Sequence, residues 1–260
     1  MLLNYQQKQA VLNEVDQKFE NIFVIHGLFG SLSNLAGLAS HLQKYHNVIS
    51  VDLRNHGDSS HFPSMSYQEM ANDLFELADH LNIDNFSIIG HSMGGKVAMT
   101  CALQCPKRIN KIVVIDIAPV SYANKHQDII NGLKAISSQK ITNRKSADLI
   151  LEKYIKTIAI RNFLLKSLQK KEIYYQLKFD LEAIIANYDL LRNKLTSDSV
   201  YNKEVLFLKG ADSNYIIPEY KDATLDLFPR AKIKIINNTG HWLHSEKPKI
   251  VNRVITQFFN

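Results

Sequence analysis

The chain has 260 residues, of which 45% are hydrophobic and 22% are charged, with a net charge of +6, as in an ordinary globular protein with one large or two small domains. No stretch approaches the roughly 18 to 20 apolar residues needed to span a bilayer, so membrane insertion is not expected. The first residues lack a basic region followed by an apolar core, so no secretory signal is expected and a cytoplasmic location is the default expectation.

The first half of the chain alternates short apolar runs with helical patterns. Two short alternating stretches at the start predict a hairpin, and apolar runs predict strands at residues 22–25, 48–51, 86–89 and 111–116. Helical periodicity falls on residues 34–45, 66–82 and 95–103, and the capping box Ser66-Tyr67-Gln68-Glu69 opens the second of these helices. Since each strand is apolar throughout, we expect a parallel sheet covered by helices on both faces.

Cys101 and Cys105 lie four residues apart on the third predicted helix. This spacing suits neither a zinc site nor a redox pair, so both are expected to be buried free thiols. Neither a metal nor a cofactor is expected.

The alternation of strands and helices stops after Pro119. From about Val120 to Tyr201 the sequence shows helical periodicity and no convincing strand. The alternation then resumes, with strands at 205–208 and 233–236 and helices at 218–228 and 247–259. The simplest organisation is an α/β core formed by residues 1–119 and 202–260, with a helical cap at 120–201 inserted after the strand that ends at Asp116.

The predicted cap carries the excess positive charge of the chain. Residues 121–200 contain 14 Lys and Arg against 8 Asp and Glu, whereas the remaining residues contain 17 of each. No nucleic-acid motif accompanies this excess, so no nucleic-acid partner is expected. These Lys and Arg residues either lie on solvated helix faces or form a basic lid that attracts an anionic group of a small-molecule substrate.

A Gly-x-Ser-x-Gly sequence joins the third predicted strand to the helix that follows it. In Gly90-His91-Ser92-Met93-Gly94, the spacing places a serine hydroxyl on a sharp strand-to-helix turn. Glycines two residues on either side leave room for the close approach of the neighbouring backbone. The motif makes Ser92 a candidate nucleophile.

Chemically useful residues follow almost every predicted strand. In an open parallel sheet, ligands bind outside the carboxyl ends of the strands. The residues at these ends are His26-Gly27-Leu28-Phe29-Gly30, Asp52, Ser92, Asp116, Asp212 and His241. A serine hydroxyl needs a general base, and that base needs a carboxylate to orient it, so the order Ser, Asp, His along the chain predicts a catalytic triad.

The base and the acid of this triad have competitors. His241 follows the last strand and Gly240, and is favoured over His244, which lies closer to the final helix. Asp116 and Asp212 each follow a core strand, and their positions alone favour the two almost equally as the triad acid. Asp52 precedes the nucleophile in the chain and is less favoured.

An oxyanion hole requires two backbone N–H groups aimed at the developing negative charge. Met93, directly after the nucleophile, is expected to supply one of them. Leu28, in the loop after the first strand, is expected to supply the other. His26 is expected to hold this loop through a hydrogen bond rather than to take part in catalysis.

Taken together, these segments resemble the α/β-hydrolase superfamily, and within it the small bacterial YbfF-type serine esterases. The resemblance rests on residues 26–31 (HGLFGS), 52–59 (DLRNHGDS), 90–96 (GHSMGGK), 114–120 (VIDIAPV) and 240–242 (GHW). It implies that Asp116 is the triad acid, because these esterases carry the acid on the strand after the nucleophile helix. At the usual superfamily position, three residues beyond Gly210, this chain has Ser213, with Asp212 one residue earlier.

The function expected from the sequence is hydrolysis of carboxylic esters or acyl thioesters through an acyl-enzyme on Ser92. The basic cap favours a substrate with an anionic group, such as an acyl-coenzyme A. Epoxide hydrolases and haloalkane dehalogenases of this fold need an aspartate at the nucleophile position, so Ser92 argues against these two activities. Hydrolysis of carbon–carbon bonds by the same residues stays open, as does a ligand-binding relative without catalysis.

Overall fold

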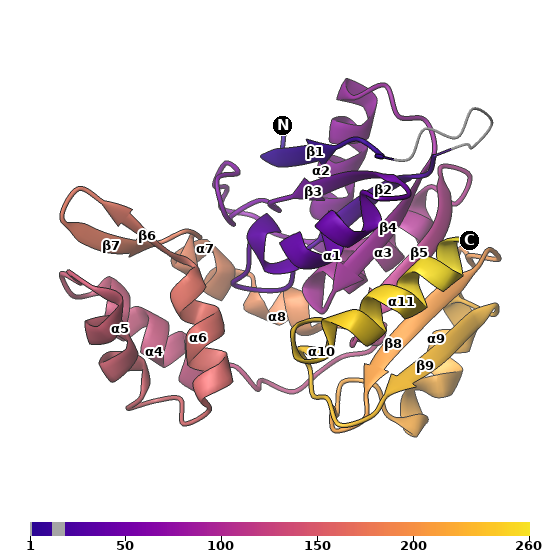
Figure 1. Cartoon of the computed structure of the whole chain (residues 1–260). Helices are drawn as coiled ribbons and strands as arrows, with labels where there is room; N and C mark the ends of the chain where they lie inside the picture. Colours follow the sequence, from indigo (N-terminus) through magenta and orange to yellow (C-terminus); the bar gives the residue numbers. More distant parts are fainter. Residues whose placement is uncertain (1, 12–18) are drawn as a thin grey trace.

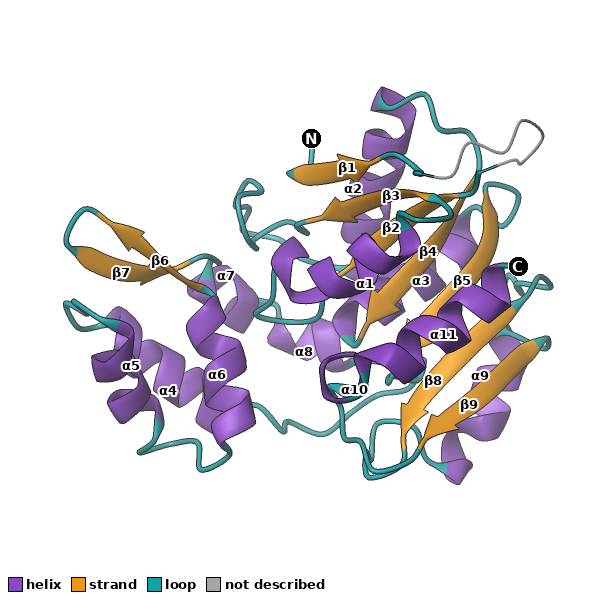
Figure 2. Cartoon of the chain, in the orientation of Figure 1, coloured by secondary structure: helices purple, strands orange, loops and turns teal. Residues whose placement is uncertain are grey.

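A seven-stranded sheet forms the centre of the molecule, and all its neighbouring strands run parallel except β1, which lies antiparallel to β3 (Figures 1 and 2). The computed structural model describes residues 2–11 and 19–260. In spatial order the strands are β1 (Tyr5–Lys8), β3 (Asn47–Val51), β2 (Asn21–Ile25), β4 (Phe86–His91), β5 (Ile109–Ile115), β8 (Val205–Gly210) and β9 (Ala231–Ile236).

The N-terminal segment does not pair with its neighbour in sequence. β1 pairs with β3, Tyr5 lying opposite Val51, so the first strand extends the edge of the main sheet. The expected hairpin also involves residues 12–18, which lie outside the described residues.

Helices cover both faces of the sheet, as the sequence predicts. One face carries α1 (Ala36–Leu42), which follows the short helix η1 (Leu32–Leu35), and α11 (Pro248–Phe259), which follows α10 (Leu243–Glu246). The other face carries α2 (Tyr67–His80), α3 (Met93–Gln104) and α9 (Lys221–Leu227), the last preceded by η2 (Pro218–Tyr220). The strands between these layers are buried on both faces, which explains their continuous apolar sequences.

The start of α2 agrees with the predicted capping box. The Ser66 hydroxyl accepts the Glu69 N–H at 3.2 Å, and the Glu69 carboxylate accepts the Ser66 N–H at 2.9 Å. Such a cap stabilises a helix by about 1 kcal/mol. The helix ends at His80, before the predicted boundary, and Asn82 adopts a positive φ of 56°.

Residues 120–201 form a group of elements beside the sheet (Figure 1). Its helices are α4 (Gln127–Ser137), α5 (Arg144–Leu151), α6 (Ile158–Lys166), α7 (Leu181–Ala186) and α8 (Tyr188–Arg192). Two strands, β6 (Leu168–Lys171) and β7 (Tyr174–Leu177), form an antiparallel hairpin. The expectation of no strand in this segment is therefore wrong. The sequence does not predict these strands because most of their side chains are exposed or half-buried, so the strands lack an alternating apolar pattern.

Both cysteines are free in the structure. Cys101 is buried on α3, as expected, whereas Cys105 is only half-buried at the end of that helix. Across residues 2–11 and 19–260, no helix has the length and apolar character required to cross a membrane.

Candidate active site

Ser92 lies at the turn between β4 and α3, with a φ of 52° and a ψ of −118°. This backbone conformation is rare for a residue with a side chain. The flanking glycines permit it, because a Cβ atom on Gly90 would lie 2.1 Å from the Gly94 carbonyl oxygen. A Cβ atom on Gly94 would lie 2.5 Å from the His26 carbonyl oxygen. The Gly-x-Ser-x-Gly spacing is therefore required by the close contact of the strand, the helix and the His26 loop.

Asp116 directly follows β5 and is fully buried. It also has a positive φ, of 55°. Its carboxylate accepts the Gly210 N–H at 3.1 Å and the Ser213 hydroxyl. These donors belong to the end of β8 and the loop after it, and they orient the carboxylate toward the loop that carries His241.

His241 contacts Asp116 directly. The His241 Nδ1 lies 2.8 Å from Asp116 Oδ2, and the imidazole stacks on the Tyr215 ring with a centroid distance of 4.0 Å and an interplanar angle of 23°. Because a carboxylate only accepts, Nδ1 carries the hydrogen in this bond. In the neutral imidazole, Nε2 is then left as the acceptor. His241 and Ser92 line the same pocket.

The competing residues are placed differently. Asp212 is exposed, and its backbone N–H donates to the Thr239 carbonyl at 2.9 Å. His244 is half-buried, and its ring packs edge-on against His91 at a centroid distance of 4.4 Å. Burial, with the nearby charges of His241 and Lys166, lowers the pKa of His244 to about 3.

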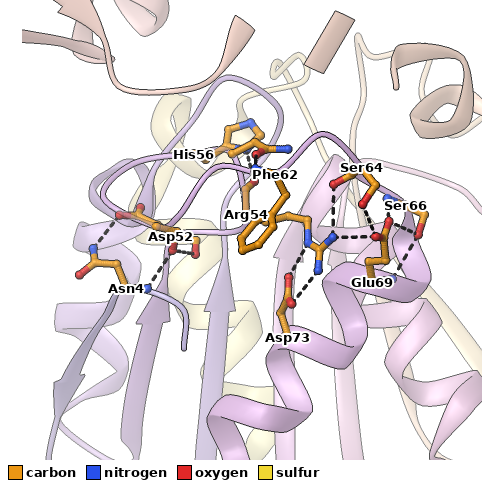
Figure 3. Close-up of polar contacts among 11 residues, drawn as sticks. Asn4, Asp52, Arg54, His56, Phe62, Ser64, Ser66, Glu69 and Asp73 are labelled. Carbon is orange, nitrogen blue, oxygen red and sulfur yellow. Dashed lines mark hydrogen bonds and ion pairs between the residues drawn. The ribbon is translucent and has the colours of Figure 1, made fainter. Parts of the chain in front are cut away.

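Asp52 holds two loops together at the end of β3 (Figure 3). Its carboxylate accepts the Asn4 amide at 2.7 Å, the Leu32 N–H at 2.7 Å and the Asp58 N–H at 2.9 Å. Two residues further on, Arg54 makes a bidentate contact with Asp73, at 2.7 and 2.8 Å. These contacts fix the loop after β3, so Asp52 has a structural role.

The loop after β2 is held by two buried histidines and a serine from the 120–201 segment. His26 accepts the Leu53 N–H at 3.1 Å and contacts the Gly27 carbonyl at 2.8 Å, as expected for a residue that fixes this loop. His56 accepts the Phe29 N–H at 3.2 Å, and the Ser167 hydroxyl donates to the Phe29 carbonyl at 2.6 Å.

Leu28 and Met93, whose backbone N–H groups are the expected donors of the oxyanion hole, come from two different parts of the fold. Leu28 belongs to the loop after β2, and Met93 is the first residue of α3. Both residues line a pocket with Ser92. Within the described ranges, neither N–H donates a hydrogen bond to another protein group.

Two pockets meet at Ser92. The first, of about 50 Å³, lies toward the segments that join residues 120–201 to the sheet, and its wall includes Lys96, Lys125 and Arg192. The second, of about 30 Å³, lies under α4 and α6, and its apolar wall includes Phe163 and Trp242. Ser92 therefore lines two small adjoining pockets, both of which also include residues of the 120–201 segment.

Comparison with known proteins identifies the family of this chain. Residues 20–248 match the family described as alpha/beta hydrolase fold. The chain belongs to this family. It is 38% identical to Esterase YbfF of Escherichia coli, with 92% of both chains covered. It is 36% identical to the mouse protein named sn-1-specific diacylglycerol lipase ABHD11, with 94% of this chain and 82% of that protein covered.

A solved structure described as a marine microorganism esterase superposes on this chain with a TM-score of 0.92. That protein is 35% identical, and the match covers 99% of both chains. Together with the family match and the sequence relatives, this similarity establishes that the chain is an esterase-type serine hydrolase.

Several side chains at the site were not assigned a role from the sequence. They are Lys96, His126, Ser213 and Tyr215. Lys96 stands in a segment on which the resemblance rests, and Ser213 stands at the usual superfamily position of the acid, so both positions offered a signal. His126 and Tyr215 lie outside those segments and reach the site only through the folding of the 120–201 segment and of the loop after β8.

Proposed function

We propose that this protein hydrolyses carboxylic esters or acyl thioesters of small molecules, with Ser92, His241 and Asp116 as the catalytic triad. Ser92 Oγ attacks the acyl carbonyl carbon while His241 Nε2 takes the hydroxyl proton. The proton then passes to the leaving alkoxide or thiolate as the bond to the acyl carbon breaks. A water molecule attacks the acyl-enzyme, with His241 again as the base, and releases the acid and free Ser92.

Asp116 has the role of orienting His241 and stabilising its protonated form. The hydrogen bond from His241 Nδ1 supports this role, and so does the burial of the carboxylate, which strengthens its interaction with a positive imidazole. The Ser213 hydroxyl and the Gly210 N–H hold the carboxylate in place. Asp212, exposed and bonded elsewhere through its backbone, has no such support.

The N–H groups of Leu28 and Met93 are proposed to stabilise the oxyanion of the tetrahedral intermediate. Both are free of other protein acceptors in the described part of the chain, and both residues line a pocket with Ser92. Fixed donors of this kind contribute about 3 to 4 kcal/mol each to the transition state. The Phe29 N–H donates to His56 and the Phe29 carbonyl accepts the Ser167 hydroxyl, and these two bonds fix the Leu28 loop.

Residues 120–201 are proposed to act as a cap that shapes the substrate pocket. Residues of this segment line both pockets at Ser92, and Lys125 and Arg192 place positive charge in one of them. This placement supports a substrate with an anionic group, such as an acyl-coenzyme A.

The observation that carries this proposal is the His241–Asp116 hydrogen bond in the same site as the strained Ser92 turn. The test is hydrolysis of a short chromogenic acyl ester by the wild-type protein and by Ser92→Ala. The variant is expected to lose activity by about 10⁴-fold or more, to the level supported by the oxyanion hole and binding alone. Equal rates in the two proteins would refute the serine mechanism.

A further inference from the structure

Lys96 is a buried cation on the nucleophile helix, one turn after Ser92. Its side chain is among the largest that are fully buried, with 1% exposure. Burial lowers the pKa of Lys96 to about 7, and in the part of the chain that the structure describes no carboxylate pairs with it. Burying an ammonium group without a carboxylate is costly, so its partners have to be strong acceptors.

The partners of Lys96 are the two chain segments that join residues 120–201 to the sheet. The ammonium donates to the Val120 carbonyl at 2.8 Å, in the segment that leaves β5, and to the Asn193 carbonyl at 2.6 Å, in the segment that returns from α8. The rings of Tyr67 and Tyr122 lie 5.5 and 5.1 Å from the ammonium and favour its charge.

The two connecting segments also bond to each other beside Lys96. The Tyr122 N–H donates to the Arg192 carbonyl at 2.9 Å, and the Leu195 N–H donates to the Pro119 carbonyl at 2.9 Å. The outgoing and returning chains therefore run together where the ammonium contacts both. A side chain of α3 thus joins the two connections of the cap to the helix that carries the nucleophile.

We propose that Lys96 is a positioning residue that ties both connecting segments of the cap to the nucleophile helix and so fixes the cap over Ser92. The proposal rests on the proposed function in one respect, the role of Ser92 as nucleophile. Its structural part concerns only the two connecting segments. Lys96 and Tyr122 line the pocket beside Ser92, so loss of this tie changes the pocket wall on the cap side.

The structural part is tested by amide hydrogen exchange in Lys96→Met. Methionine fills a similar volume without a donor, and loss of an unpaired buried charge offsets the loss of two hydrogen bonds, so the variant is expected to fold. Exchange at the Tyr122 and Leu195 amides is expected to rise about tenfold, which corresponds to about 1.4 kcal/mol. Amides of β4 and β5 are expected to stay unchanged.

Lys194→Met is the matched control. Lys194 lies on the returning segment and is exposed, and its backbone N–H, rather than its side chain, bonds across to Ser121 among the residues that the structure describes. This variant is expected to exchange like the wild type. Unchanged exchange at Tyr122 and Leu195 in Lys96→Met, or an equal rise throughout the sheet, overturns the proposal. If Lys96→Met does not fold, Lys96→Gln, with a shorter donor, is measured against the same two outcomes.

The functional part is tested by comparing acyl chains in Lys96→Met. For a long-chain ester, which reaches the cap, KM is expected to rise about tenfold with little change in kcat. For an acetyl ester, KM is expected to rise less than it does for the long-chain ester. An equal fall of kcat for both esters overturns the proposal, because Lys96 would then act on the reacting atoms. Activity retained by Ser92→Ala would instead refute the proposed nucleophile and leave the exchange result standing.

Discussion

The backbone at Ser92 stores strain that its neighbours hold in place. A residue with a side chain in this region of φ and ψ costs about 1 to 3 kcal/mol. The Ser92 N–H donates to the Ile115 carbonyl at 2.9 Å, and the Ser92 carbonyl accepts the Gly95 N–H at 2.8 Å. These bonds to the next strand and the next helix offset the strain. They keep the hydroxyl at the edge of the sheet, where the two pockets meet.

The assignment of the triad acid makes a prediction for two aspartates. Asp116→Asn is expected to lower kcat by about 10⁴-fold, because an amide at this position no longer fixes the imidazole in the required tautomer. Asp212→Asn, the same chemical change at an exposed site, is expected to leave kcat within about twofold of the wild type. Steady-state hydrolysis of a chromogenic ester measures both. A severe loss in Asp212→Asn alone would contradict the assignment.

At the scale of single residues, the local sequence predicts those candidate site residues that lie in recognisable motifs. Ser92 and His241 each follow a strand and have characteristic glycine neighbours. The choice between Asp116 and Asp212 depended on the side-chain direction after two strands, which the sequence pattern does not define. The support from Ser213 joins residues 97 positions apart, and only the folded sheet brings them together.

At the scale of elements, the buried strands were the most predictable features. A strand covered on both faces has to be apolar throughout, and this signal is strong for β2, β4 and β5. The β6–β7 hairpin gives no such signal. Its strands have only partly buried faces, and its turn depends on Glu172 at a positive φ of 55°. Tertiary contacts, such as the bridge from Ile141 to Tyr175, stabilise it instead.

The basic cap makes a prediction about salt and substrate charge. For an anionic acyl thioester, KM is expected to rise about tenfold as salt rises from about 0.05 to 0.5 M, because salt screens its attraction to the positive pocket. For a neutral ester with the same acyl chain, KM is expected to change little. Steady-state kinetics at several ionic strengths measures both. A constant KM for the thioester, together with better turnover of the neutral ester, would contradict this prediction. The Lys and Arg residues of the cap would then face solvent without attracting the substrate.

At the scale of the whole molecule, histidines that stay neutral in the fold link stability to pH. Burial, followed by nearby positive groups, lowers the pKa of His56 to about 3 and that of His126 to about 4. His244 is lowered to about 3 in the same way. An unfolded histidine takes up its proton near pH 6.5, whereas these remain neutral in the fold. The unfolded state therefore binds more protons below that pH.

The free energy of unfolding is predicted to fall as the solution is acidified. Stability from these histidines is present above pH 6.5 and is lost as pH falls toward their folded pKa values. Each of these histidines is expected to lower the free energy of unfolding by about 1 kcal/mol as pH falls from 6.5 to 5.5. Urea unfolding at pH 6.5 and at pH 5.5 measures the change in the free energy of unfolding. In His244→Phe, this change is expected to be smaller by the contribution of one histidine. A free energy that does not change with pH would contradict burial of these rings in the neutral form.

The central claim is that Ser92 carries the acyl group during turnover. The most direct measurement is mass spectrometry of the protein quenched with acid during hydrolysis of an activated ester, followed by peptide mapping. The account predicts one acyl group, found on the peptide that contains Ser92 and missing from Ser92→Ala. An acyl group on another residue, or product formation in Ser92→Ala at the wild-type rate, would contradict it.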